Sequence, residues 1–222
     1  MASPAPPSRR LPPRRTVVIG VTGAPAAGKS TVTGMMADLG AAVVDADALA
    51  HEALSTPRLA RAVERALGVP VRRADGTVDR GAVADRVFGG GDPGALGRLT
   101  DLLHPVVLRR MRGAVAAARR ARARAVVLDV PLLFEAGVDG TCDFTVFVDA
   151  PRRVRLARAR ARGWTAAELG RREARQAPAA ERRRRADGTV DNGGSRSATR
   201  RQVRALWAAA LASGNQSRTR RT

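Results

Sequence analysis

The sequence predicts a three-layer α/β/α fold in which helices cover both faces of a parallel sheet, with a helical lobe and a lid inserted into it. Short apolar runs at 17–21, 41–45, 126–130 and 144–149 have the length and composition of buried parallel strands. The first run leads into a glycine-containing loop and then a helical pattern, an order typical of phosphate-binding α/β domains. Mainly helical sequence separates the second run from the third and is too long for a simple crossover.

The loop at residues 23–30 reads Gly-Ala-Pro-Ala-Ala-Gly-Lys-Ser and fits the phosphate-loop pattern G-x-x-x-x-G-K-S. Gly23 and Gly28 allow the backbone to turn sharply and to approach phosphates, and the helix that follows presents free N–H groups to an anion. Lys29 is predicted to reach the β- and γ-phosphates and Ser30 to ligate Mg²⁺. Further nucleotide contacts are predicted for Ala26, Ala27 and Thr31.

Lys29 is the only lysine in the chain, and apart from two histidines every other basic residue is arginine. The planar guanidinium of arginine does not reproduce the compact charge of a lysine ammonium group. A drift towards arginine that spares this position favours a working phosphate loop over a chance match to the motif.

The 222 residues suffice for one domain with a sizeable core. We expect a single domain over residues 16–212, a disordered N-terminal arm at 1–15 and a loose C-terminal tail at 213–222. The arm lacks the apolar stretch of a secretory signal, and no run is long enough to span a membrane. The single cysteine, Cys142, excludes an internal disulfide framework, so we expect a cytoplasmic protein.

The formal net charge of +20 has two interpretations. One is binding to nucleic acid or to a membrane surface; the other is a compositional drift towards arginine in an enzyme whose substrates are polyanions. No aromatic residues interleave with the basic runs and tyrosine is absent, so the stacking platforms of single-strand binders are missing. We therefore expect no specific nucleic acid and no membrane as partner, with non-specific binding at low salt.

Carboxylates end the second and third strand-like runs, where ligands of open α/β sheets bind. Asp45 and Asp47 point to the same side if the chain stays extended there. One of them could then orient or deprotonate a hydroxyl group, or hold Mg²⁺ through water. The alternative is that Asp47 only caps a helix. Asp129 ends the third run in the position of a Mg²⁺-organising carboxylate.

Residues 55–124 predict an inserted helical lobe. Its long last helix is expected to break or kink at His104-Pro105, because proline lacks a backbone donor. His104 is then either a ligand contact or a packed residue at the kink. Residues 131–135, Pro-Leu-Leu-Phe-Glu, are either core or the wall of an acceptor pocket. The other predicted helices of the lobe are 57–67 and 79–88.

Residues 152–185 are dense in arginine and follow the fourth strand-like run. Such a run is usually a solvated helix face. Its place after a strand of a phosphate-binding fold favours instead a lid whose arginines, Arg158 and Arg162 among them, close on a phosphoryl group. A short strand at 189–192 and a helix from Ser195 to about 212 complete the prediction.

Together these residues resemble the dephospho-coenzyme A kinase family over roughly residues 17–211. The loop motif is general to phosphate-loop proteins, whereas Asp45-Ala46-Asp47, His104-Pro105 and the run from Asp129 to Glu135, in this order and spacing, are much more specific. The other segments add to the resemblance. All the segments outside the loop are Val44-Asp45-Ala46-Asp47, Leu103-His104-Pro105, Asp129 to Glu135, Val148 to Pro151, Arg162-Gly163, Arg172 with Gln176, Arg185 to Asp187, and Asp191 to Ser195.

The resemblance implies transfer of the γ-phosphoryl group of ATP to the ribose 3′-hydroxyl of dephospho-CoA, with Mg²⁺, by a monomer or small homo-oligomer. It implies that Asp47 is the base or hydroxyl-orienting group, and that Lys29, Arg158 and Arg162 are the other catalytic residues. The remaining implied contacts are Asn192 near adenine, His104, Leu132, Phe134 and Glu135 at the acceptor, and Ser30 and Asp129 at the metal.

The chain departs from the family pattern inside the loop, where the usual sequence is Gly-Gly-Ile-Gly-Ser-Gly-Lys-Ser. Pro25 removes one N–H group, and Ala26 replaces a glycine and would resist a positive φ. We expect weaker nucleotide binding from these two changes. The lid is also one residue shorter just after Arg162.

Two alternatives remain open on the residues alone. One is another small-metabolite or nucleoside kinase on the same core, which a panel of acceptors distinguishes. The other is a phosphate-loop switch or a nucleic-acid-associated NTPase, suggested by the charge. Guanine-specific switches need an Asn-Lys-x-Asp segment, which is absent because Lys29 is the only lysine.

Overall fold

The computed structural model describes residues 15–88 and 92–216, so most of the predicted N-terminal arm and the end of the predicted tail lie outside the described residues. The strands are β1 (Val17–Gly23), β2 (Ala41–Asp45), β3 (Ala125–Asp129), β4 (Phe144–Asp149) and β5 (Gly188–Asp191). The helices are α1 (Lys29–Asp38), α2 (Ala46–Leu54), α3 (Pro57–Leu67), α4 (Arg80–Phe88), α5 (Ala95–Arg120), a 3₁₀ turn η1 (Val138–Thr141), α6 (Arg152–Arg160), α7 (Ala166–Glu173), α8 (Ala179–Arg185) and α9 (Arg196–Gln216).

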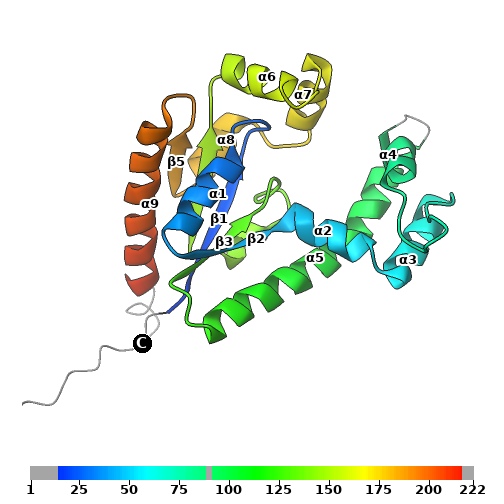
Figure 1. Cartoon of the computed structure of the whole chain (residues 1–222), viewed down its shortest axis with the longest axis horizontal. Coiled ribbons are helices and arrows are strands. Elements are labelled where there is room, and N and C mark those ends of the chain that lie inside the picture. Colours follow the sequence, from blue (N-terminus) through cyan, green and yellow to red (C-terminus); the bar gives the residue numbers. More distant parts are fainter. Residues whose placement is uncertain (1–14, 89–91, 217–222) are drawn as a thin grey trace, which may run out of the picture.

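The described strands form one parallel sheet in the order β2-β3-β1-β4-β5. Figure 1 shows helices on both sides of this sheet, which confirms the predicted three-layer fold. The register pairs Asp45 with Asp129 and Val21 with Asp129, so the carboxyl ends of β1, β2 and β3 lie at one edge. The phosphate loop leaves β1 at this same edge, as the sequence predicts.

Two apolar clusters hold the layers together. One face of the sheet packs against α1 and α9 around Ile19, Met36 and Trp207. The other face packs against the second half of α5 around Leu128 and Met111. Each side chain is placed by the alternation of a strand or the period of a helix, so the core follows the predicted apolar pattern.

The helical lobe projects from the sheet and has an apolar cluster of its own, formed by α3, α4, the end of α2 and the first half of α5. Of the expected break or kink at His104-Pro105, the break is wrong, because α5 continues through Pro105, and the kink stays a prediction. Apolar residues on both sides of the proline hold the helix: Leu103 packs on the lobe cluster before it, and Val107 and Leu108 pack on the sheet cluster after it. This burial outweighs the single helical hydrogen bond that a proline removes.

The predicted boundaries of the lobe and of the last helix need correction. The lobe cluster begins before residue 55, because Ala53 and Leu54 of α2 belong to it. The last helix extends past residue 212 to Gln216, so the first part of the predicted loose tail is helical. Its cap at Ser195 is confirmed, since the Ser195 hydroxyl accepts a hydrogen bond from the Ala198 N–H at 3.2 Å. In the described part of the chain, no helix is long and apolar enough to cross a membrane.

Candidate active site

The phosphate loop is held in shape by contacts that only glycine permits. Gly28 has a φ of 92°, and a β-carbon there would lie 2.3 Å from Nδ2 of Asn192. A β-carbon on Gly23 would lie 2.4 Å from the carbonyl oxygen of Val148. Helix α1 begins immediately after the loop at Lys29, so its free N–H groups and positive dipole end face the loop's concave side.

Two side chains from distant parts of the chain brace the carbonyl oxygen of Ala27. Arg158 of α6 donates to it at 2.9 Å and also donates to the Asn192 carbonyl at 2.8 Å. The Asn192 amide donates to Ala27 at 2.8 Å, and its own oxygen accepts from the Thr199 hydroxyl at 3.0 Å. The geometry therefore gives Arg158 and Asn192 contacts that position the loop.

The remaining loop residues show how this chain accommodates its departures from the family pattern. Ala26 adopts a φ of 59°, so the position does require a positive φ, and alanine pays about 1 kcal/mol or more for it. The Ala27 N–H closes a turn onto the Ala24 carbonyl at 3.0 Å. Pro25 lies between them and faces the large cleft described below.

A cavity of about 160 Å³ lies directly against the loop, at the carboxyl edge of the sheet. It brings together the side chains predicted to handle phosphate, metal and the reacting hydroxyl: Lys29, Ser30, Asp45, Asp47, Asp129 and Arg162. The expected extended geometry at Asp45 and Asp47 is wrong, because α2 begins at Ala46. Asp45 caps that helix by accepting from the N–H groups of Asp47 and Ala48 at 2.8 and 3.1 Å. Asp47 is therefore not the cap and is free to face the cavity.

Both remaining acids of this cavity hold protons more tightly than an exposed aspartate. Burial raises the pKa of Asp47, the negative charge of Asp45 adds to the rise, and Lys29 opposes it. Burial raises the pKa of Asp129 to about 6, again opposed by Lys29. Oδ1 of Asp129 is buried without a hydrogen-bond partner. Such an orphaned carboxylate oxygen costs stability until a cation or donor reaches it.

We expect Asp129→Asn to raise the stability of the ligand-free protein at pH 8 by about 2 kcal/mol. The folded state binds a proton at Asp129 up to a pKa of about 6, above the ordinary 3.8. Stability of the native protein therefore falls as pH rises through this window and stays low above it. Asparagine carries no charge to desolvate, so thermal unfolding in chelator should show its advantage at pH 8 and lose it near pH 4.

Asp45→Asn is the matched control for this measurement. Asparagine caps helices as well as aspartate does, and the Asp45 side chain is exposed, so little change is expected at either pH. An Asp129→Asn advantage that is independent of pH, or a loss of stability at pH 8, would contradict a destabilising buried charge.

A large cleft of about 680 Å³ lies between three walls, and residues of the segment 130–138 also line it. One wall is the phosphate loop, with Pro25, Ala26 and Lys29. The other two walls are the lobe, which contributes α2 and α5, and the lid, which contributes residues from Arg162 to Gln176. Asp47 lies between the three walls, in both the cleft and the smaller cavity.

The structure separates the four predicted acceptor residues into two pairs. His104 and Leu132 line the cleft. Phe134 is buried in the sheet core under the Arg185 guanidinium, 4.5 Å from its ring centroid, and is not among the residues that line the cleft. Glu135 accepts a hydrogen bond from the Ala177 N–H at 2.6 Å, which anchors the end of the lid. The apolar run at 131–135 is therefore cleft wall at one position and core at another.

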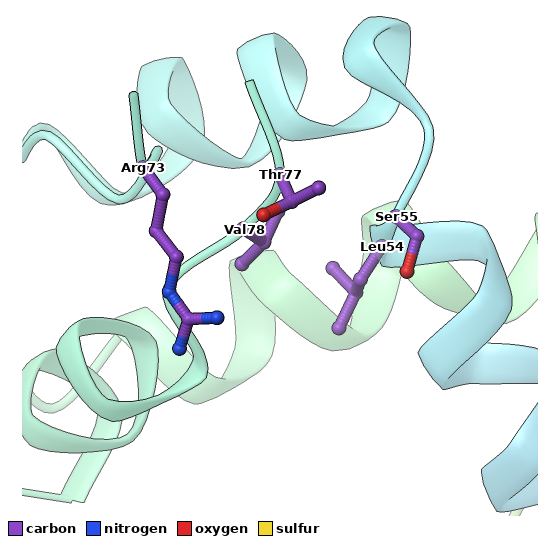
Figure 2. Close-up of a pocket in the computed structure, with 5 residues that line it drawn as sticks. All are labelled: Leu54, Ser55, Arg73, Thr77 and Val78. Atoms are coloured by element: carbon purple, nitrogen blue, oxygen red, sulfur yellow. The ribbon is translucent and has the colours of Figure 1, made fainter. Parts of the chain in front are cut away.

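A further pocket of about 440 Å³ lies on the other side of the loop. It is lined by Gly28, Thr31, Arg158, Ala161, Arg162, Asn192, Gly194 and Arg196. Because Arg162 lines this pocket, the cavity and the cleft, the three spaces meet around the phosphate loop. By contrast, the hollow in Figure 2, where the end of α2 meets the segment from Arg73 to Val78, shares no residue with them.

Three lid residues that face the cleft have no role predicted from sequence: Trp164, Arg172 and Gln176. Trp164 is stacked by Arg172, whose guanidinium carbon lies 4.0 Å from the ring centroid. Gln176 donates to the carbonyls of Gly23 at 3.2 Å and Pro131 at 2.9 Å, which ties the lid to β1 and to the segment that follows β3. Trp164 is one of only two tryptophans, and a tryptophan within an arginine-rich run was a signal that could have been used.

Among the described residues, no three acidic, histidine or cysteine side chains lie close enough together to hold a metal ion by themselves. The donors at the cavity are instead the Ser30 hydroxyl and single carboxylates. This set fits Mg²⁺, which proteins bind through one or two carboxylates together with water and substrate phosphates.

Comparison with known proteins gives consistent matches. The family model for dephospho-CoA kinase matches residues 17–197. Dephospho-CoA kinases from Symbiobacterium thermophilum and Deinococcus radiodurans are 43% and 42% identical, over 87% and 86% of this chain and 81% and 89% of their own lengths. The crystal structure of TT1252 from Thermus thermophilus aligns with a TM-score of 0.74 at 35% identity, over 87% of this chain and 97% of that one.

Proposed function

Because this chain belongs to the dephospho-CoA kinase family, we propose that its cleft transfers the γ-phosphoryl group of ATP to the ribose 3′-hydroxyl of dephospho-CoA, giving coenzyme A and ADP. The observation that carries the proposal is the convergence of a phosphate loop, three carboxylates and the lid residue Arg162 on one cavity. Phosphoryl transfer needs little covalent chemistry from the protein and is catalysed mainly by positioning and charge stabilisation.

ATP is the co-substrate, and we place its phosphates against the loop and the start of α1. Lys29 and the N–H groups at the helix N-terminus then face the β- and γ-phosphates. The base occupies the pocket between Arg158, Asn192 and Arg196. The Asn192 side chain is committed to the loop and to Thr199, so this residue supports the nucleotide through the loop's shape and through the wall it forms.

Dephospho-CoA occupies the large cleft, with its ribose at Asp47 and the rest of the molecule along the lobe. The lobe wall supplies apolar surface from α5 and the His104 ring. Leu96 and Leu132, two of the three most exposed large apolar side chains of the described structure, face this same cleft. Their exposure is explained if an acceptor covers them.

Asp47 orients the acceptor hydroxyl and takes its proton. Its raised pKa makes it a stronger base than an ordinary aspartate, and the positive charge of Lys29 limits that rise. Arg162, which lines both the cavity and the cleft, faces the transferred group from the lid. Its charge would stabilise the equatorial oxygens in the transition state.

Mg²⁺, when bound, would supply positive charge that offsets the negative charge of the phosphates. Ser30 and Asp129 are the residues that would hold it, and the unpartnered Oδ1 of Asp129 supports this placement. The Asp129 carboxylate that would bind the cation is therefore the same group that lowers the stability of the ligand-free protein. We further propose a monomer or small homo-oligomer that works in the cytoplasm, with residues 55–124 as acceptor lobe and residues 152–185 as lid.

The test is ADP release from Mg·ATP at moderate salt, with and without dephospho-CoA. We expect ADP release to depend on dephospho-CoA and to yield one coenzyme A per ADP. Shikimate, nucleosides and single-stranded RNA serve as comparison acceptors or activators. Turnover that ignores dephospho-CoA, or that RNA stimulates, would reject the proposed acceptor.

A further inference from the structure

Ala26, in the phosphate loop, has a backbone conformation that its side chain opposes. Its φ of 59° lies in the left-handed region, which glycine adopts freely and alanine does not. Among the described residues Arg122 is the only other non-glycine residue with a positive φ. A strained position of this kind persists only where the surrounding contacts hold it.

The contacts of the Ala26 methyl group come from the lid. Ala26 is buried in a small apolar cluster with Ala159 and Leu169, and Leu156 and Trp164 pack against it. All of these partners lie on or between α6 and α7. A glycine at position 26 would relax the loop and leave the cluster without its contribution from the loop.

The largest member of this cluster also supports two arginines. The guanidinium carbons of Arg172 and Arg162 lie 4.0 and 5.8 Å from the centroid of the Trp164 ring. Both arginines line the cleft together with Lys29 and Asp47. Arg172 is also paired with Glu168 of its own helix at 2.8 Å. The ring therefore packs on the cluster that contains the loop methyl group and also stacks with two cations that line the cleft.

We propose that Ala26 is a positioning residue for phosphoryl transfer: its methyl group fixes the Trp164 ring, and the ring holds Arg162 and Arg172 towards the transferred group. The alanine thereby couples the lid to the phosphate loop. From the sequence, alanine at this position was expected only to weaken nucleotide binding. In our proposal the alanine that strains the loop also orders the lid. The inference rests on the proposed role of the lid arginines in the transfer.

The first test is Ala26→Gly in the full chain, followed by acrylamide quenching of tryptophan fluorescence. Trp207, the other tryptophan, is 7% exposed in the core, so the accessible signal comes from Trp164. We expect its quenching constant to rise about twofold. We expect kcat to fall about fourfold, the equivalent of one buried methylene group, while KM for ATP stays unchanged or falls because the loop is relaxed.

Ala24→Gly is the matched control for the quenching. It removes a methyl group from the same loop, but Ala24 packs in the sheet cluster and not in the lid cluster, so Trp164 quenching should not change. Unchanged quenching in Ala26→Gly would overturn the contact, and raised quenching with an unchanged kcat would overturn the positioning of the arginines. Quenching does not depend on turnover. It would therefore still test the contact between Ala26 and Trp164 if the protein did not catalyse the proposed reaction.

A double-mutant cycle tests the pathway through the ring. Trp164→Leu keeps an apolar side chain under the lid and removes the surface on which the arginines stack. If Ala26 acts through Trp164, Ala26→Gly should reduce kcat little further in the Trp164→Leu background. Fully additive losses would overturn this pathway.

Discussion

Asp47→Asn is expected to lower kcat about 10³-fold, within the range for removal of a general base, while ATP affinity changes less than about threefold. The asparagine has nearly the same shape, so the cavity and the N-terminus of α2 should persist. What is lost is the capacity to accept the proton of the acceptor hydroxyl. Because burial raises the pKa of Asp47, the acid-side fall of wild-type kcat should begin at a higher pH than an ordinary aspartate would give. The check is a pH profile of kcat together with nucleotide binding by titration calorimetry.

Asp45→Asn is the comparison that separates chemistry from structure. Asp45 lies two residues away and lines the same small cavity, but its carboxylate is engaged as the helix cap. We expect it to retain kcat within about tenfold, because asparagine preserves the cap. If both variants lost turnover equally, Asp47 would have no distinct part in the proton transfer. An Asp47→Asn enzyme with normal turnover would remove the base from the mechanism altogether.

The fold was largely predictable because its elements have strong local patterns. The buried strands are continuous apolar runs, and β2 and β4 have the predicted bounds. The helix break expected at Pro105 does not occur, and the reason is tertiary packing. A local rule counts the missing N–H group, whereas α5 is held on both sides of the proline by two separate apolar clusters.

The sequence predicted which residues gather at the candidate site better than it predicted how their side chains are placed. The phosphate loop, Asp47 and Asp129 meet in one cavity as the strand order requires. The sequence could not show that Asp45 rather than Asp47 is the cap, since both fit the pattern of a helix N-terminus. Nor could it place Phe134 in the core, because one apolar run supplies both core and cleft wall. The roles of Arg158 and Asn192 depend on side chains that bond to backbone over more than a hundred residues, which no local pattern encodes.

Lys29→Ala is expected to lower kcat about 10³-fold and to weaken ATP binding about tenfold, because one charge serves both the bound phosphates and the transition state. Lys29 is the first residue of α1 and faces both the small cavity and the cleft. Its removal would also leave Asp129 without the cation that lowers its pKa, and Asp47 without the first of the three cations that lower its own. Direct nucleotide titration and single-turnover rates measure the two effects separately.

Lys29→Arg distinguishes charge from shape. A guanidinium keeps the charge but is planar, longer and a fork of donors rather than a point. It should restore most ATP binding and, by our expectation, less than about a tenth of the lost turnover, because the γ-phosphoryl group needs a compact cation at one place. Full activity in Lys29→Arg would mean that charge alone suffices, and the survival of a single lysine among the arginines would then need another cause. Full activity in Lys29→Ala would refute the phosphate loop as the centre of the reaction.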